Sequence, residues 1–85
     1  MPRYFDDVRY GAAVRQARTK RGLSHRDIAN AFNVRLALVS YVERGGEPTP
    51  EFVSAAKSKL KIDRDHFRLD ARGNNAQVAA NQNQL

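Results

Sequence analysis

The sequence predicts an all-α fold, a compact bundle of about five helices with a disordered C-terminal tail. Apolar residues recur at helical spacing, and residues that cap helices stand in front of several of these runs. No stretch alternates cleanly with β-branched residues, and no Asn-Gly or Asp-Gly hairpin turn occurs. With 85 residues, the chain has room for one small domain.

The first helix is predicted over about 7–21. Asp6 or Asp7 is placed to cap its start, and Gly22 stands where a C′ glycine commonly ends a helix. The residues that give the helical spacing are Tyr10, Val14, Ala17 and Arg21.

Two short helices follow. Ser24 and Asp27 form the S-x-x-D pattern of a capping box and predict a helix over about 25–32. Asn33 interrupts it, because Asn tolerates the left-handed conformation of a tight turn. The next helix, about 35–44, stops at two glycines. The apolar residues of the pair are Ile28, Ala29 and Phe32, then Leu38 or Val39, then Val42.

The last elements are equally well marked. Thr49 and Pro50 read as an N-cap and an N1 proline, so a helix is predicted over about 50–60. Asp63 or Asp65 then caps a final brief helix. Phe52, Val53, Ala56 and Leu60 form the apolar face of the longer helix.

The charge is strongly basic and unevenly distributed. The formal net charge is +6, with eleven Arg and four Lys. Residues 11–45 carry seven of these cations against Asp27 and Glu43, an excess of five. A basic block rich in Arg suits the phosphates and guanine edges of nucleic acid. The alternative is a solvated basic face without a partner.

The composition argues against several other classes. There is no Cys, so a disulfide framework, a thiolate nucleophile or a cysteine-bound zinc cannot form. His25 and His66 lie far apart, and we expect no metal, no cofactor and no small-molecule ligand. An enzyme is the poorest reading, because no catalytic constellation is visible. No run is long enough for a membrane span and no leader opens the chain, so we expect a cytoplasmic protein with no membrane partner.

The segment around residues 24–44 has the residue types that a helix-turn-helix requires. Ala29 is a small residue where two helices would cross, Asn33 makes the turn, and Val34 flanks it with an apolar side chain. The second helix can then stand out from the domain and enter a major groove.

This segment resembles the Cro/C1-type (XRE-like) helix-turn-helix family of small phage, plasmid and bacterial repressors. The resemblance covers about residues 10–69, and its most specific parts are the Gly-Leu-Ser opening and the Glu-Arg-Gly ending. The matching residues are Gly22-Leu23-Ser24, Asp27-Ile28-Ala29, Asn33-Val34, Val39-Ser40, Val42-Glu43-Arg44-Gly45 and Pro48.

The resemblance implies a λ-repressor-like bundle and a buried ion pair between Arg18 and Glu43. The alternative for Arg18 is an ordinary contact with a DNA phosphate. The chain is then divided into an N-terminal segment, 1–9, a helix-turn-helix domain, 10–70, and a tail, 71–85. The tail is rich in Asn and Gln and has too little apolar surface to pack alone, so it is predicted to be disordered.

By resemblance, the helix at about 35–44 is the recognition helix. Arg35 can reach a guanine edge. Leu36 and Ala37 stand where the family often has polar base readers. They could contact a thymine methyl, shift the readout to neighbours, or mean that the helix reads little sequence. Tyr41 is equally well read as a packing residue. The base-reading set is Arg35, Leu36, Ala37, Ser40 and Tyr41.

Phosphate contacts are expected at the free N–H groups that begin the preceding helix. For His25 a neutral polar contact is favoured over a pH-dependent one. The expected phosphate-binding set is Ser24, His25, Arg26 and Arg44, with Lys20 and Arg21 as weaker candidates.

The resulting hypothesis is a sequence-specific repressor of transcription that binds double-stranded DNA as a homodimer at a palindromic operator. A controller or activator of the restriction–modification type remains an alternative, as does a protein–protein adaptor such as an antitoxin or antirepressor. Without a ligand domain after the helix-turn-helix, no built-in small-molecule sensor is expected. The aromatic N-terminal segment either packs on the bundle or forms an arm, and Phe67 and Leu69 either close the core or join a dimer surface.

Overall fold

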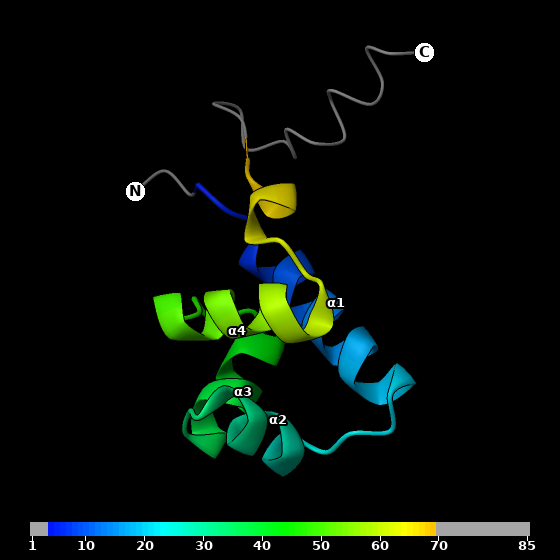
Figure 1. The fold of residues 1–85 in the computed structure, drawn as a ribbon. Coiled ribbons are helices and arrows are strands. Elements are labelled where there is room, and N and C mark those ends of the chain that lie inside the picture. Colours follow the sequence, from blue (N-terminus) through cyan, green and yellow to red (C-terminus); the bar gives the residue numbers. More distant parts are fainter. Residues whose placement is uncertain (1–3, 70–85) are drawn as a thin grey trace.

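The structure, a computed structural model of the chain, describes residues 4–69. This part of the chain is all-helical, as predicted, except that the fifth helix is a four-residue 3₁₀ turn and not an α-helix. The predicted tail, 71–85, lies outside the described residues. The elements are α1 (Asp7–Lys20), α2 (His25–Phe32), α3 (Leu36–Glu43), α4 (Pro50–Leu60) and the 3₁₀ helix η1 (Arg64–Phe67) (Figure 1).

The capping residues explain where the helices begin. Asp6 accepts a hydrogen bond from the backbone N–H of Arg9 at the start of α1. Thr49 accepts one from the N–H of Phe52, with Pro50 in the first turn of α4. Both starts agree with the sequence predictions.

The helix ends are less predictable. Gly22 has a positive φ of 69° after α1, as its residue type suggests. At the end of α4, however, Lys61 takes the left-handed conformation, with a φ of 60°. Lysine carries no sequence signal for this conformation, so it could not have been predicted.

The core lies where all four α-helices meet. Tyr10 is fully buried and packs edge-on against Phe52 and Phe67, with ring centroids 6.5 and 5.5 Å apart. Burial raises the pKa of the Tyr10 hydroxyl to about 12, an effect that the nearby Arg64 partly opposes. The buried apolar side chains are Tyr10, Val14, Ile28, Ala29, Phe32, Val39, Val42, Phe52, Ala56 and Leu60.

Gly11 allows α1 and α3 to approach closely. It is buried on α1, and a Cβ atom added to it would overlap the backbone carbonyl oxygen of Val42 in α3. Backbone lies on the other side of this contact, so no flexible side chain can move away. Gly11 therefore fixes the distance between the first helix and the third.

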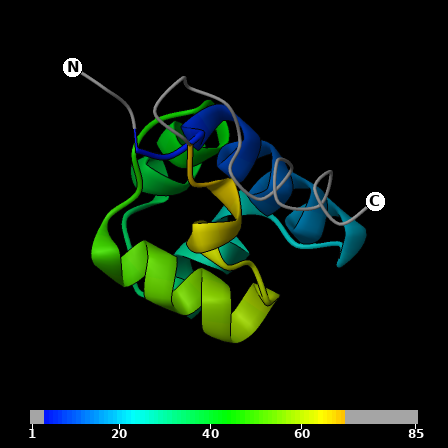
Figure 2. The ribbon, with the colours of Figure 1, turned by 90° about the horizontal axis from the view of Figure 1, so that it is seen from above.

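The two ends of the described chain are paired. The N–H of Asp6 donates to the carbonyl of Phe67 at 2.7 Å, and the N–H of Leu69 donates to the carbonyl of Tyr4 at 2.8 Å. An isolated antiparallel bridge joins Phe5 to the same segment. Seen from above, the start of α1 and η1 lie next to each other (Figure 2).

The N-terminal aromatics divide between packing and exposure. Phe5 is half-buried beneath the guanidinium group of Arg64, whose central carbon lies 4.2 Å from the ring centroid. Arg64 also pairs with Asp7 at 2.8 Å, which ties η1 to the start of α1. Tyr4, by contrast, is 72% exposed.

Replacing Gly11 with Ala should lower the free energy of unfolding by about 1–3 kcal/mol, because the added methyl group forces α1 away from α3. Urea denaturation monitored by circular dichroism measures the loss. Ala12→Ser, at the exposed neighbouring position, should stay within about 0.5 kcal/mol of the parent. Equal stability of the Gly11→Ala variant would contradict the close approach.

Candidate nucleic-acid interface

The turn between α2 and α3 has the local structure that the sequence predicts. The Ser24 side chain accepts from the N–H of Asp27 at 3.0 Å, and the Asp27 carboxylate accepts from the N–H of Ser24 at 2.8 Å. These reciprocal bonds lower the pKa of Asp27, mainly through the backbone donor. After α2, Asn33 has a left-handed φ of 56°, and the N–H of Val34 donates to Ala29. The capping box and the Asn33 turn are confirmed.

One face of α3 is buried and the other is exposed. Val39 and Val42 are fully buried, as predicted, and Leu38 packs against the core. Arg35 is the N-cap residue and makes no side-chain capping bond, so its guanidinium group is not used to begin the helix. Of the predicted base-reading residues, Ser40 is half-buried and the others are exposed: Arg35, Leu36, Ala37 and Tyr41.

Arg18 and Glu43 form an ion pair with two hydrogen bonds between α1 and the last residue of α3. Arg18 Nε lies 2.7 Å from Glu43 Oε2, and Nη2 lies 3.1 Å from Oε1. Arg18 Nη1 also donates to the carbonyl of Leu23 at 2.9 Å. The side chain of Glu43 is 6% exposed. Arg18 therefore connects α1, the loop before α2 and α3.

His25 completes this cluster. Its Nε2 atom lies 3.0 Å from Glu43 Oε1, and its side chain is 39% exposed. Burial alone would raise the pKa of Glu43, but hydrogen bonds and charges from Arg18 and His25 outweigh it and hold this pKa below its ordinary value. The hydrogen bond to Glu43 likewise raises the pKa of Arg18. Glu43 is thus an ionised acceptor that orients His25 at the start of α2.

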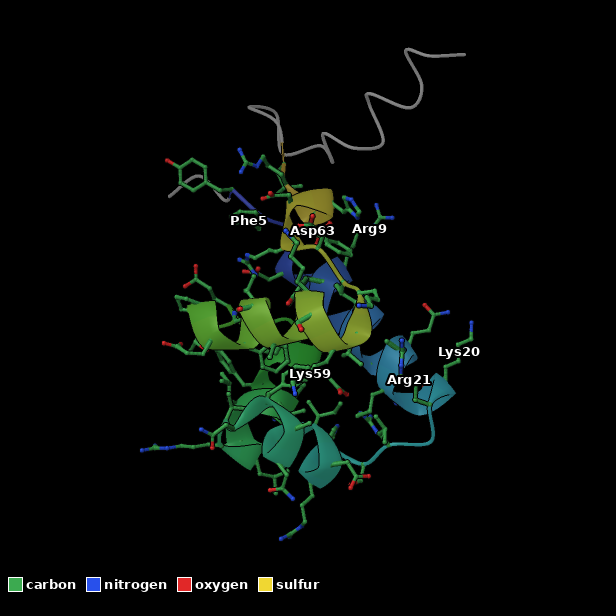
Figure 3. All side chains as sticks on the ribbon, viewed as in Figure 1. Phe5, Arg9, Lys20, Arg21, Lys59 and Asp63 are labelled. Carbon is green, nitrogen blue, oxygen red and sulfur yellow. The ribbon has the colours of Figure 1, made fainter. Side chains whose placement is uncertain are left out.

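Of the predicted phosphate-binding residues, His25 and Arg44 line one hollow together with Arg18 and Glu43. Arg26 and Arg44 are exposed. Ser24 is exposed too, and because its oxygen accepts a bond in the capping box, its hydroxyl proton remains available to an incoming acceptor. Lys20 and Arg21 lie at the far end of α1, where the chain turns toward α2 (Figure 3).

Arg15 belongs to this group and the sequence reasoning missed it. A shallow hollow of about 320 Å³ is lined by Arg15, Arg18, His25, Ser40, Glu43 and Arg44. Arg15 lies three residues before Arg18 and therefore on the same face of α1. This spacing is the signal in the sequence that could have identified it. The hollow is predominantly basic, which suits a phosphate group.

Tyr41 is held in place by the turn that follows α3. A Cβ atom added to Gly46 would overlap the Tyr41 ring, so the ring lies directly against the backbone of Gly46. Half of the Tyr41 side chain remains exposed. The packing interpretation and a contact with DNA are therefore compatible for this residue.

Comparison with known proteins agrees with this geometry. A family model described as Helix-turn-helix (HTH_3) matches residues 14–67. The chain belongs to this Cro/C1-type helix-turn-helix family of DNA-binding proteins. No curated protein matches the sequence. Family membership favours a DNA-binding regulatory protein over an enzyme.

A solved structure shares the helix-turn-helix fold. It is the crystal structure of ClgR, the clp gene regulator from Corynebacterium glutamicum, with 29% sequence identity and a TM-score of 0.59. The similarity covers 67% of this chain and 62% of the ClgR chain, so this helix-turn-helix protein spans less than two thirds of ClgR. No helix within residues 4–69 is long and apolar enough to cross a bilayer.

Replacing Arg18 with Met should lower the free energy of unfolding by about 3–5 kcal/mol at neutral pH, because Glu43 loses its main partner while it stays buried. Thermal and urea unfolding measure the effect. Arg15→Met, at an exposed arginine of the same helix, is the matched control and should change stability by at most about 0.5 kcal/mol. Comparable losses in the two variants would contradict a structural role for the pair.

Because the pKa of Glu43 is lowered, the free energy of unfolding depends on pH in the acidic range. The carboxylate contributes stability above its unfolded pKa of roughly 4.3, and this contribution disappears as pH falls through the lower folded pKa. In Glu43→Gln, the decline in unfolding free energy below about pH 4.5 should therefore be shallower than in the parent. Urea titrations at several pH values test this, with Glu47→Gln at an exposed glutamate as the control. Parallel curves for parent and Glu43→Gln would refute it.

Proposed function

We propose that this helix-turn-helix protein is a sequence-specific transcriptional repressor. In this proposal α3 lies in the major groove of an operator and blocks a promoter. The observation that carries the proposal is the exposed face of α3, which the Arg18–Glu43 pair holds beside a basic hollow. Family membership supports double-stranded DNA as the partner. We expect such a regulator to work in the cytoplasm.

The roles of the exposed residues follow from their positions. Arg35, at the start of α3, is proposed to donate to a guanine edge. Ser24 and His25 lie at the N-terminus of α2, where free N–H groups and the helix dipole favour a phosphate. The proposed phosphate contacts are Ser24, His25, Arg26 and Arg44, joined by Arg15. Leu36, Ala37, Ser40 and Tyr41 complete the base-reading face of α3.

We also propose that two copies bind together. One small module reads few base pairs, and two modules on half-sites about 34 Å apart gain affinity and read a palindrome. Sedimentation of the protein with and without its operator tests this point. A single protein copy on the operator at micromolar concentration would refute the dimer while leaving DNA binding intact.

Selection from random duplex DNA tests the specific function. We expect an enriched inverted repeat, bound at least about 10³-fold more tightly than random DNA. Arg35→Ala should relax specificity at one base pair, at a cost of about 1–3 kcal/mol. Arg44→Ala should weaken binding to all sequences and reduce the salt dependence. Fluorescence anisotropy at two salt concentrations measures both.

Arg9→Ala is the charge-matched control, because Arg9 lies near η1 at the end of the molecule away from α2 and α3 (Figure 3). This variant should bind the operator as the parent does. If no motif is enriched and the affinity for DNA only falls steeply as salt rises, the proposed repressor function is wrong. That result would favour the adaptor function, in which the exposed apolar residues of α3 bind a protein.

A further inference from the structure

The first turn of α3 exposes apolar side chains. Leu36 begins the helix and is 43% exposed, and Ala37 beside it is exposed. Leu38, by contrast, packs against the core, and Val39 is fully buried. The folding of the domain accounts for Leu38 and Val39, but it gives no reason for an exposed leucine at position 36.

The polar residues of the same face do not supply a polar contact at this first turn. Ser40 lies one turn later, is half-buried and lines the basic hollow. The ring of Tyr41 packs against Gly46, which follows the C-terminal end of α3, and so lies at the opposite end of the helix from its first turn. The end of α3 that leads into a groove therefore presents Arg35, Leu36 and Ala37.

The charge around this apolar turn indicates what covers it. The acidic residue of α3 is Glu43, which is buried against Arg18 and His25. Arg35 and Arg44, the residues that flank α3, are both exposed, and Glu51 of α4 lines a hollow with Arg35 and Leu38. A helix that exposes an apolar first turn and has an exposed arginine at each end is complementary to a polyanion that also displays apolar groups. The major groove of DNA does so through the 5-methyl group of thymine.

We propose that Leu36 reads the 5-methyl group of a thymine in each operator half-site, with the small Ala37 allowing close approach. This inference rests on the proposed function and adds the chemistry of its recognition. Arg35, one residue earlier, would contact a guanine close to that thymine. Because the methyl group is the feature that is read, 5-methylcytosine should be accepted where unmethylated cytosine is not.

The test uses the operator from the selection experiment and the full chain. Each thymine of one half-site is replaced in turn with deoxyuridine, which removes the methyl group and keeps every hydrogen-bonding atom. At one or two positions we expect about a fourfold loss of affinity, the effect of one buried methyl group. At such a position, an operator with a C·G pair should bind weakly. Replacing that cytosine with 5-methylcytosine should raise the affinity again by about fourfold.

Leu36→Ala identifies the protein side of the contact. This variant should bind the thymine operator more weakly, and it should no longer distinguish thymine from deoxyuridine at the sensitive position. Val8→Ala, at an exposed apolar residue of α1, is the matched control and should keep the full distinction. Thermal unfolding of both variants confirms that they fold.

The outcomes separate this inference from the function on which it rests. An enriched operator in which every thymine can be replaced with deoxyuridine without loss of affinity would overturn the inference. The proposed repressor function would stand. A methyl effect that persists unchanged in Leu36→Ala would overturn the inference in the same way. Failure to enrich any motif would overturn both, and would point to a protein that covers the apolar turn.

Discussion

The ion pair between Arg18 and Glu43 determines how α3 is held against the rest of the domain. Glu43 is the last residue of α3 and Arg18 lies near the end of α1, so their two hydrogen bonds fix one end of α3 against the bundle. Arg18 also holds the loop at Leu23, directly before α2. A buried pair of this kind contributes little net stability compared with apolar packing, but it penalises any arrangement that separates the charges. Its main effect is to specify one orientation.

Gly11 provides the steric counterpart of this electrostatic contact. The ion pair pulls the end of α3 toward α1, and the missing side chain at Gly11 allows the two backbones to meet at Val42. Both contacts lie on the inner side of α3. On the outer side Arg35, Leu36 and Ala37 are exposed, so these three residues are not required for the packing of the core.

The local features of the fold could be predicted from sequence because they depend on neighbours within a few residues. The Ser24–Asp27 capping box, the Asn33 turn and the Thr49–Pro50 start all belong to this class. The left-handed Lys61, the close approach at Gly11 and the pairing of Asp6 with Phe67 could not be predicted in this way. They depend on how distant segments meet, and no local pattern encodes that.

The candidate interface shows the same division. The Arg18–Glu43 pair followed from the family resemblance and is present in the structure. The contact between His25 and Glu43 and the place of Arg15 in the basic hollow required the spatial arrangement of three helices. The exposure of Leu36 could be anticipated, but its separation from the partly buried Leu38 and the buried Val39 depended on how α3 is rotated against the core.

The pairing of Tyr4 and Asp6 with residues 67–69 has a topological consequence. The chain enters and leaves the described unit at adjacent points, and both points lie at the end of the molecule away from α2 and α3 (Figure 1). Such a unit can be inserted into a surface loop of another protein, or circularly permuted with a short connector. An insertion made at this end leaves α2 and α3 untouched, because the junction lies away from them.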